Sequence, residues 1–115
     1  MGFLDRLLGR SAALTPVAAH ERAAAGELLL VDVREPGEFR SGHAPGARNV
    51  PLAGVGAACA QLAADGRDVA FVCKSGMRSG AAVSAARQHG LHAANVRGGM
   101  LAWQRAGLPT TTKGR

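Results

Sequence analysis

Three short runs of apolar residues stand out along the chain, at 28–33 (LLLVDV), 68–72 (DVAFV) and 93–96 (AANV). Continuous apolar runs of this length, rich in branched side chains, are typical of strands buried on both faces of a parallel sheet. A fourth segment, NVPL at 49–52, predicts a brief strand that its proline keeps short. The apolar pattern therefore predicts a buried sheet built from short strands.

Helical patterns fill the segments between these strands. Thr15 and Pro16 read as an N-cap followed by proline at the first helical position, opening a helix that Gly26 closes. Further helices are expected at 55–64, at 79–90 and in the closing segment 98–109. Residues 34–48 are interrupted by proline and glycine, which predicts turns with one short helix around Glu38 and Phe39. Strands that alternate with helices predict one α/β domain, a parallel sheet flanked by helices on both faces.

The first 14 residues precede this alternating pattern. Four apolar residues among the first eight fit one face of a short helix, so we expect a short amphipathic extension at 1–14 and the domain at 15–113. Such an extension could dock on the domain, on a partner or on a membrane surface. It lacks the apolar centre and cleavage site of a secretory signal, and no run reaches the ~18 apolar residues of a membrane span.

The charge of the chain favours an anionic partner. Fourteen Lys and Arg residues against eight Asp and Glu residues give a formal net charge of +6. The arginines are scattered, however, and aromatic residues make up only 3% of the chain, so there is little surface on which bases could stack. A small anionic substrate is therefore favoured over nucleic acid.

The cysteines and histidines predict neither a disulfide framework nor a metal site. Cys59 and Cys73 are too few for the first, and their spacing matches no zinc pattern. The four histidines form no helical pair with a carboxylate, and no cofactor is implied. Both cysteines are expected to be reduced thiols in the cytoplasm. Cys59 lies in an alanine-rich helix and reads as a small core residue, although it could act as a resolving cysteine if it lay beside Cys73.

Cys73 carries the chemistry that the sequence predicts. It ends the second long apolar run and is followed, before the expected helix, by Lys74, Ser75, Gly76, Met77, Arg78 and Ser79. Gly76 allows the backbone to turn so that successive N–H groups point inward, and the following helix adds the positive end of its dipole. A thiolate held there would have a lowered pKa and would be a competent nucleophile. The alternative is a buried structural cysteine, but an inert thiol has no need of such a loop.

Charges are expected around this loop. Lys74 and Arg78 would hold a doubly charged anion in front of the thiolate. Asp32 and Arg34 follow the first long apolar run. Because the carboxyl ends of parallel strands meet at one edge of a sheet, where ligands of open sheets bind, these two residues should share that edge with Cys73.

Three segments together resemble the rhodanese family of sulfurtransferases in its single-domain form. They are LLLVDVREPGEFRSGHAPGARNVP, FVCKSGMRS and NVRGGMLAWQRAGLP, and the resemblance runs from about Gly26 to Thr111. It implies that Cys73 is a nucleophile that takes a sulfane sulfur from a donor such as thiosulfate and holds it as a persulfide. The persulfide would pass its outer sulfur to cyanide, a thiol or a protein cysteine.

The resemblance also implies roles for other residues. Lys74 to Arg78 match the rest of the active-site loop, and Asp32 and Arg34 match an Asp-x-Arg that we expect to brace it. His43 is expected to be a satisfied hydrogen-bonding residue, and Trp103 to belong to the core or a lid. The remaining matches are Phe39, Pro45, Gly46 and Ala47 in the first signature and Gly98, Gly99, Gly107 and Pro109 in the closing one.

Two alternatives to a stand-alone sulfurtransferase stay open at this point. Phosphatases and arsenate reductases of rhodanese-like architecture place arginine after Cys and five further residues, which here would be position 79. This chain has Ser79, with Arg78 one step too early, and the shorter loop suits a terminal sulfur better than a tetrahedral phosphate. The second alternative is a persulfide carrier, or a binding and regulatory module, that serves a partner protein.

Overall fold

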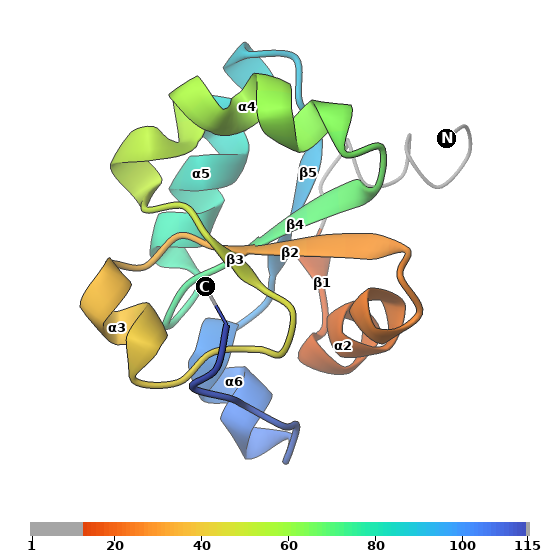
Figure 1. Ribbon diagram of the computed structural model, residues 1–115, viewed down its shortest axis with the longest axis vertical. Helices are drawn as coiled ribbons and strands as arrows, with labels where there is room; N and C mark the ends of the chain where they lie inside the picture. Colours follow the sequence, from red (N-terminus) through yellow and green to blue (C-terminus); the bar gives the residue numbers. More distant parts are fainter. Residues whose placement is uncertain (1–12, 115) are drawn as a thin grey trace.

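The computed structural model describes residues 13–114, which form a parallel sheet between two layers of helices (Figure 1). The chain order is β1 (Ala13–Leu14), α2 (Pro16–Ala24), β2 (Leu28–Asp32), α3 (Pro36–Arg40), β3 (Arg48–Asn49), a 3-10 turn (Leu52–Gly54), α4 (Val55–Ala64), β4 (Asp68–Val72), α5 (Met77–Gln88), β5 (Ala93–Val96) and α6 (Gly99–Arg105). The predicted α/β class, with a parallel sheet and helices on both faces, is confirmed.

The sheet places β4 at its centre. The strand order is β1-β5-β4-β2-β3, and every neighbouring pair is parallel. Asp32, the last residue of β2, lies opposite Val72, the last residue of β4. The segments that leave β2 and β4 therefore start from the same edge of the sheet, as the sequence predicts for Asp32, Arg34 and Cys73.

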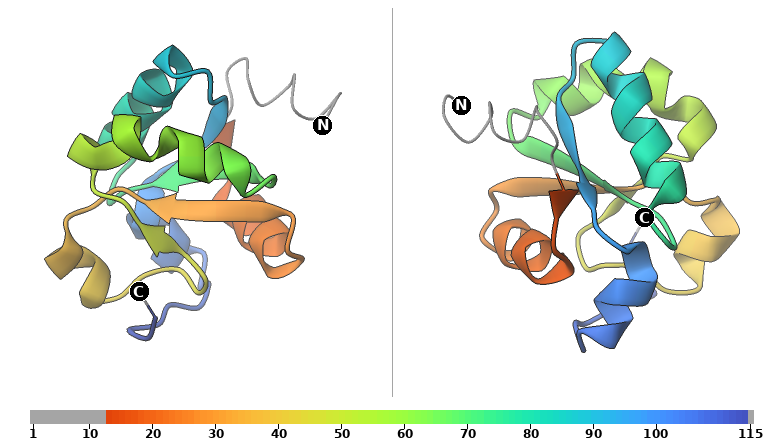
Figure 2. Two further views of the ribbon diagram at one scale, coloured as in Figure 1. Left: turned by 45° about the horizontal axis from the view of Figure 1, so that its top comes forward. Right: turned by 180° about the vertical axis from the view of Figure 1, so that it is seen from behind.

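Each face of the sheet packs against its own helices (Figure 2). Leu28 and Leu30 point into a layer that contains Trp103 and residues of α2 and α6. Leu29 and Val31 point to the opposite layer, which contains residues of α4 and α5. Because both faces are covered, all five residues of β2 are buried, and this explains why its first four residues are apolar without alternation.

Several element boundaries differ from the prediction. α5 begins at Met77 and not at position 79, because Gly76 adopts a φ of 110° and turns the chain directly from the loop into the helix. The strand expected at 49–52 is confined to Arg48–Asn49. Ala13 and Leu14, within the expected extension, form β1 and pair with β5, a strand too short to produce a pattern. The amphipathic helix expected within residues 1–12 lies outside the described residues.

No helix within residues 13–114 is both long enough and apolar enough to cross a membrane.

Candidate active site

Cys73 lies directly after β4, enclosed by its own loop. The residue is 1% exposed. The backbone N–H of Gly76 donates to its Sγ over 3.0 Å, and the Ser79 hydroxyl lies 3.3 Å from the same sulfur. Met77, Arg78 and Ser79 form the first turn of α5. The loop and the helix start thus direct donor groups at one sulfur atom.

The pKa of Cys73 reflects two opposed effects. Burial of the thiol acts to raise it, and this is the largest single contribution. Hydrogen bonds from the Ser79 hydroxyl and from the backbone of Ser79, Gly76 and Ser75 act in the other direction. Together they outweigh burial, so the pKa of Cys73 lies below that of an ordinary thiol. A larger fraction of the residue is therefore thiolate at neutral pH.

The start of α6 holds the cysteine loop in place through two backbone hydrogen bonds. The N–H of Met100 donates to the Cys73 carbonyl over 2.8 Å, and the N–H of Leu101 donates to the Lys74 carbonyl over 3.0 Å. This approach needs glycine at position 99, where φ is 60° and a Cβ would lie 2.5 Å from the Cys73 carbonyl oxygen and closer still to that of Lys74. Gly99, in the Gly98-Gly99 pair at the start of α6, is thus a structural requirement of the cysteine loop.

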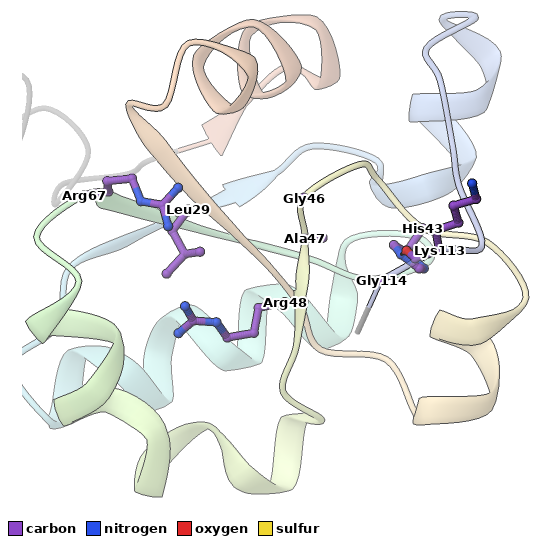
Figure 3. A pocket seen from close by; sticks show the side chains of 8 residues that line it. All are labelled: Leu29, His43, Gly46, Ala47, Arg48, Arg67, Lys113 and Gly114. Atoms are coloured by element: carbon purple, nitrogen blue, oxygen red, sulfur yellow. The ribbon is translucent and has the colours of Figure 1, made fainter.

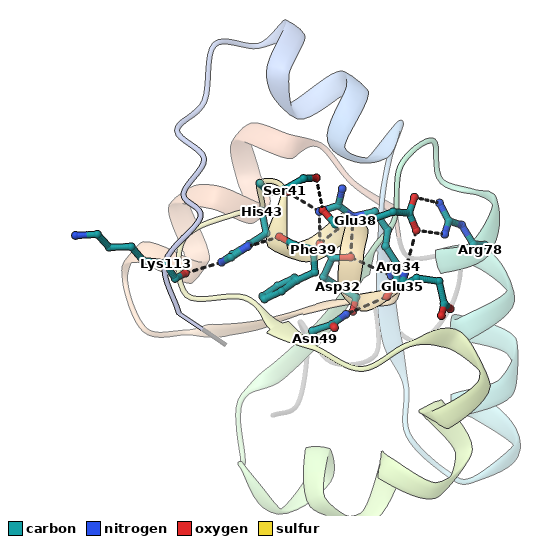
Figure 4. Close-up of polar contacts among 11 residues, drawn as sticks. Asp32, Arg34, Glu35, Glu38, Phe39, Ser41, His43, Asn49, Arg78 and Lys113 are labelled. Carbon is teal, nitrogen blue, oxygen red and sulfur yellow. Dashed lines mark hydrogen bonds and ion pairs between the residues drawn. The ribbon is translucent and has the colours of Figure 1, made fainter.

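The two loop cations have different surroundings. Lys74 is exposed, and no ion pair joins it to a carboxylate within residues 13–114. Arg78 makes a two-point ion pair with Glu38 of α3, with N–O distances of 2.7 and 3.0 Å (Figure 4). The Arg78 guanidinium, with help from the Glu35 N–H, lowers the pKa of Glu38 to about 2. The charge of Arg78 is therefore balanced at neutral pH.

Sequence reasoning did not assign Glu38 to the site. The only signal available was its position in the short helix that follows the carboxyl end of β2. That helix places the carboxylate opposite the first turn of α5, which brings together residues 40 positions apart.

Asp32 and Arg34 bind each other at the end of β2. Arg34 donates to both carboxylate oxygens of Asp32, with a shortest distance of 2.7 Å, and to the carbonyl of Gly42 over 2.8 Å. The Asn49 amide donates to the carbonyls of both residues. The pair thus ties β2, β3 and the segment after α3 together (Figure 4). None of the hydrogen bonds within residues 13–114 joins either residue to residues 73–79, so the expected bracing of the cysteine loop stays a prediction.

His43 and Trp103 have structural surroundings. The ring nitrogens of His43 each lie 2.7 Å from a carbonyl oxygen, those of Phe39 and Lys113, and the ring stacks on Phe39 (Figure 4). Trp103 is 0% exposed and donates its indole N–H to the Pro109 carbonyl. Both residues hold the C-terminal segment against the domain.

Cys59 is buried in α4, in the same apolar layer as Cys73. Its thiol donates to the Val55 carbonyl over 3.2 Å, and burial raises its pKa. Within residues 13–114, both cysteines are free thiols.

A cavity of about 470 Å³ lies beside β3, away from the cysteine loop (Figure 3). Its lining includes Arg48, Arg67 and Lys113 but no residue of 73–79. Arg67 is already paired with Asp65 at 2.6 Å. Within the described residues, no group of three His, Cys, Asp or Glu side chains is arranged to hold a metal ion.

The chain belongs to the rhodanese family. The family model of the Rhodanese-like domain matches residues 15–106, which include the cysteine loop and the Gly98-Gly99 support.

Relatives and solved structures agree with this family. A sulfurtransferase of Allochromatium vinosum is 39% identical over 84 residues, which cover 72% of this chain and 78% of that protein. An HTH-type transcriptional regulator of Mycobacterium tuberculosis is 39% identical over 99 residues, or 84% of this chain, but the match spans only 43% of that longer protein. The family and the first of these relatives support sulfurtransferase activity in general.

Two solved structures have the same fold. A rhodanese-related protein of Thermoplasma volcanium has a TM-score of 0.77 at 26% identity, covering 89% of this chain and 99% of that one. A protein of Rhodopseudomonas palustris, described as a possible tyrosine phosphatase, has a TM-score of 0.80 at 27% identity, covering 94% and 90%.

Proposed function

We propose that this protein transfers a sulfane sulfur from a small anionic donor, such as thiosulfate, to a thiophilic acceptor through a persulfide on Cys73. The observation that carries this proposal is the set of N–H and O–H donors that converges on Sγ. These donors favour the thiolate that begins the reaction.

The reaction balances in two displacement steps. The Cys73 thiolate attacks the outer sulfur of thiosulfate, a new S–S bond forms, and sulfite leaves with the electron pair of the bond that breaks. The acceptor then attacks the outer sulfur of the persulfide, and the Cys73 thiolate leaves. No net oxidant, reductant or cofactor is needed, and with cyanide the product is thiocyanate.

Phosphate chemistry fits this loop less well, although one similar structure is described as a possible tyrosine phosphatase. A phosphate ester is tetrahedral and bulky, whereas Cys73 is 1% exposed beneath a loop that reaches α5 after only three residues. Arginine is one position too early, and its guanidinium is engaged by Glu38. A terminal sulfur is smaller than a phosphate group and needs less room to reach Sγ.

A persulfide carrier for a partner protein would use the same intermediate. The loop keeps its cysteine and both cations, which favours sulfur transfer over a purely regulatory module. A thiol or protein cysteine in the reducing cytoplasm is the acceptor that we infer.

The direct experiment loads the protein with thiosulfate and looks by intact mass for one added sulfur atom, located on the Cys73 peptide. Adding cyanide should remove this atom and release thiocyanate. Hydrolysis of an aryl phosphate by a protein that never carries sulfur would overturn the proposal in favour of a phosphatase.

A further inference from the structure

Asn95 of β5 touches the cysteine site through two groups. Its Oδ1 lies 2.6 Å from the Ser79 hydroxyl oxygen, and its Nδ2 donates to the Gly76 carbonyl over 3.2 Å. The same Ser79 hydroxyl lies 3.3 Å from Cys73 Sγ and is fully buried. One hydroxyl group therefore stands between a thiol and an amide oxygen.

The orientation of the Asn95 amide follows from its neighbours. If the amide were reversed, its oxygen would face the Gly76 carbonyl oxygen, and two acceptors would meet without a hydrogen. With Nδ2 toward Gly76, the amide oxygen faces Ser79. The only hydrogen that can then lie between the two oxygens is that of the Ser79 hydroxyl.

That hydrogen cannot serve Cys73 at the same time. In the thiol state the groups form a consistent chain, because the thiol S–H donates to the Ser79 oxygen and the Ser79 O–H donates to Asn95. In the thiolate state the sulfur needs donors, and the Ser79 hydroxyl must rotate toward it. This rotation leaves two oxygens 2.6 Å apart with no hydrogen between them, which opposes the thiolate.

We propose that Asn95 is a positioning residue that competes with Cys73 for the single hydroxyl hydrogen of Ser79. This role rests on the proposed function of Cys73 as the nucleophile. Once a sulfur is attached, Sγ carries no charge and the hydroxyl returns to Asn95. Asn95 therefore disfavours the free thiolate but not the persulfide, which shifts the loop toward its sulfur-loaded form.

The charged groups near Cys73 are the same in the wild-type protein and in the alanine variants that test this role. Its own loop supplies Lys74 and Arg78, α3 supplies Glu38, and the end of β2 supplies the Asp32–Arg34 pair. None of them is altered by substitutions at positions 79 and 95.

The test is the pH profile of Cys73 alkylation by iodoacetamide, followed by mass on the Cys73 peptide. Asn95→Ala should lower the midpoint and, at a pH below it, speed alkylation roughly two- to fourfold, because thiolate fraction rises more than its nucleophilicity falls. Ser79→Ala should raise the midpoint. The double variant should match Ser79→Ala alone, because without the hydroxyl Asn95 has nothing to hold.

Asn95→Asp supplies a second variant of nearly the same shape. Its carboxylate would hold the hydroxyl more firmly and add negative charge, so the midpoint should rise. Circular dichroism confirms that each variant is folded.

An unchanged or higher midpoint in Asn95→Ala overturns the proposal. A difference in midpoint between the double variant and Ser79→Ala also overturns it, because Asn95 would then act through Gly76 and not through the Ser79 hydroxyl. A lowered midpoint in Asn95→Asp has the same effect. Alkylation needs no sulfur donor. If the midpoints move as expected but thiosulfate never loads the protein, the proposed function fails. The competition of Asn95 for the Ser79 hydrogen then stands, but its effect on sulfur loading does not.

Discussion

The two cysteines of this domain lie in one apolar layer and are almost equally buried, yet their thiols are shifted in opposite directions. Cys73 is 1% exposed and Cys59 is 3% exposed. The pKa of Cys59 is raised by burial, whereas that of Cys73 is lowered although burial acts to raise it. Burial alone therefore does not separate a reactive thiol from an inert one.

The direction of the backbone makes the difference. Within α4, the Cys59 thiol donates to the Val55 carbonyl, one turn earlier, and this acceptor favours the neutral form. Cys73 stands between the end of a strand and the start of a helix, where N–H groups have no partner within the helix. These N–H groups donate to the sulfur and favour the charged form.

The largest expected effect comes from replacing each cysteine by serine. Cys73→Ser should lower sulfur transfer by roughly three orders of magnitude or more, because a hydroxyl is a poor sulfur acceptor. Cys59→Ser should retain most of the activity. The measurement is thiocyanate release from thiosulfate and cyanide, with circular dichroism to show that both variants fold. A comparable loss in Cys59→Ser would mean that Cys59 takes part in the reaction.

A second substitution disturbs the loop of Cys73 and leaves the surroundings of Cys59 unchanged. Gly99→Ala places a Cβ against the carbonyls of Cys73 and Lys74 at a φ of 60°. Strain and overpacking together should cost about 2–4 kcal/mol in the free energy of unfolding, and activity should fall with the displaced loop.

Gly107→Ala is the matched control. Gly107 has a φ of 74°, but nothing lies within 4 Å of a Cβ added there. It should show the strain alone, about 1–2 kcal/mol by urea unfolding, with activity unchanged. Equal activity losses in both variants would contradict the supporting role of the α6 start.

The sequence pattern was sufficient for the sheet and the cysteine loop because both depend on local order. Apolar runs locate β2 and β4, parallel pairing brings their ends to one edge, and Gly76 allows the turn into α5. The same reasoning missed β1, whose two residues carry no periodicity, and placed the start of α5 two residues late.

Glu38 and Asn95 could not be assigned from sequence for a different reason. Glu38 reaches Arg78 across 40 positions, and Asn95 reaches Ser79 across 16. Each contact depends on the rotation of a helix or the register of a strand. A shift of one residue in β5 would point Asn95 to the other face of the sheet. Such contacts follow from packing and not from any local pattern.

The two cations Lys74 and Arg78 belong to the loop of Cys73, and their effects on the thiosulfate donor can be tested separately. Lys74→Ala should raise the KM for thiosulfate roughly tenfold, because a charge-assisted contact to the dianion is lost. Replacing Arg78 and Glu38 together by glutamine removes a pair that is already neutral, and should change KM less than about threefold. If the double variant loses as much as Lys74→Ala, Arg78 contacts the donor itself.

The smallest expected effect comes from freeing Arg78 while keeping it in place. Because the pKa of Glu38 is about 2, its carboxylate stays charged throughout the pH range in which Cys73 ionises, and its charge is lost only as the pH falls toward that value. Glu38→Gln should therefore lower the KM for thiosulfate about two- to threefold at neutral pH, with less change for an uncharged sulfur donor, and added salt should reduce the gain. Glu27→Gln changes the net charge equally at the opposite end of β2, where Glu27 is 63% exposed, and should leave KM unaltered. A KM that rises in Glu38→Gln would show that Glu38 serves to position Arg78 on the donor and not to mask its charge.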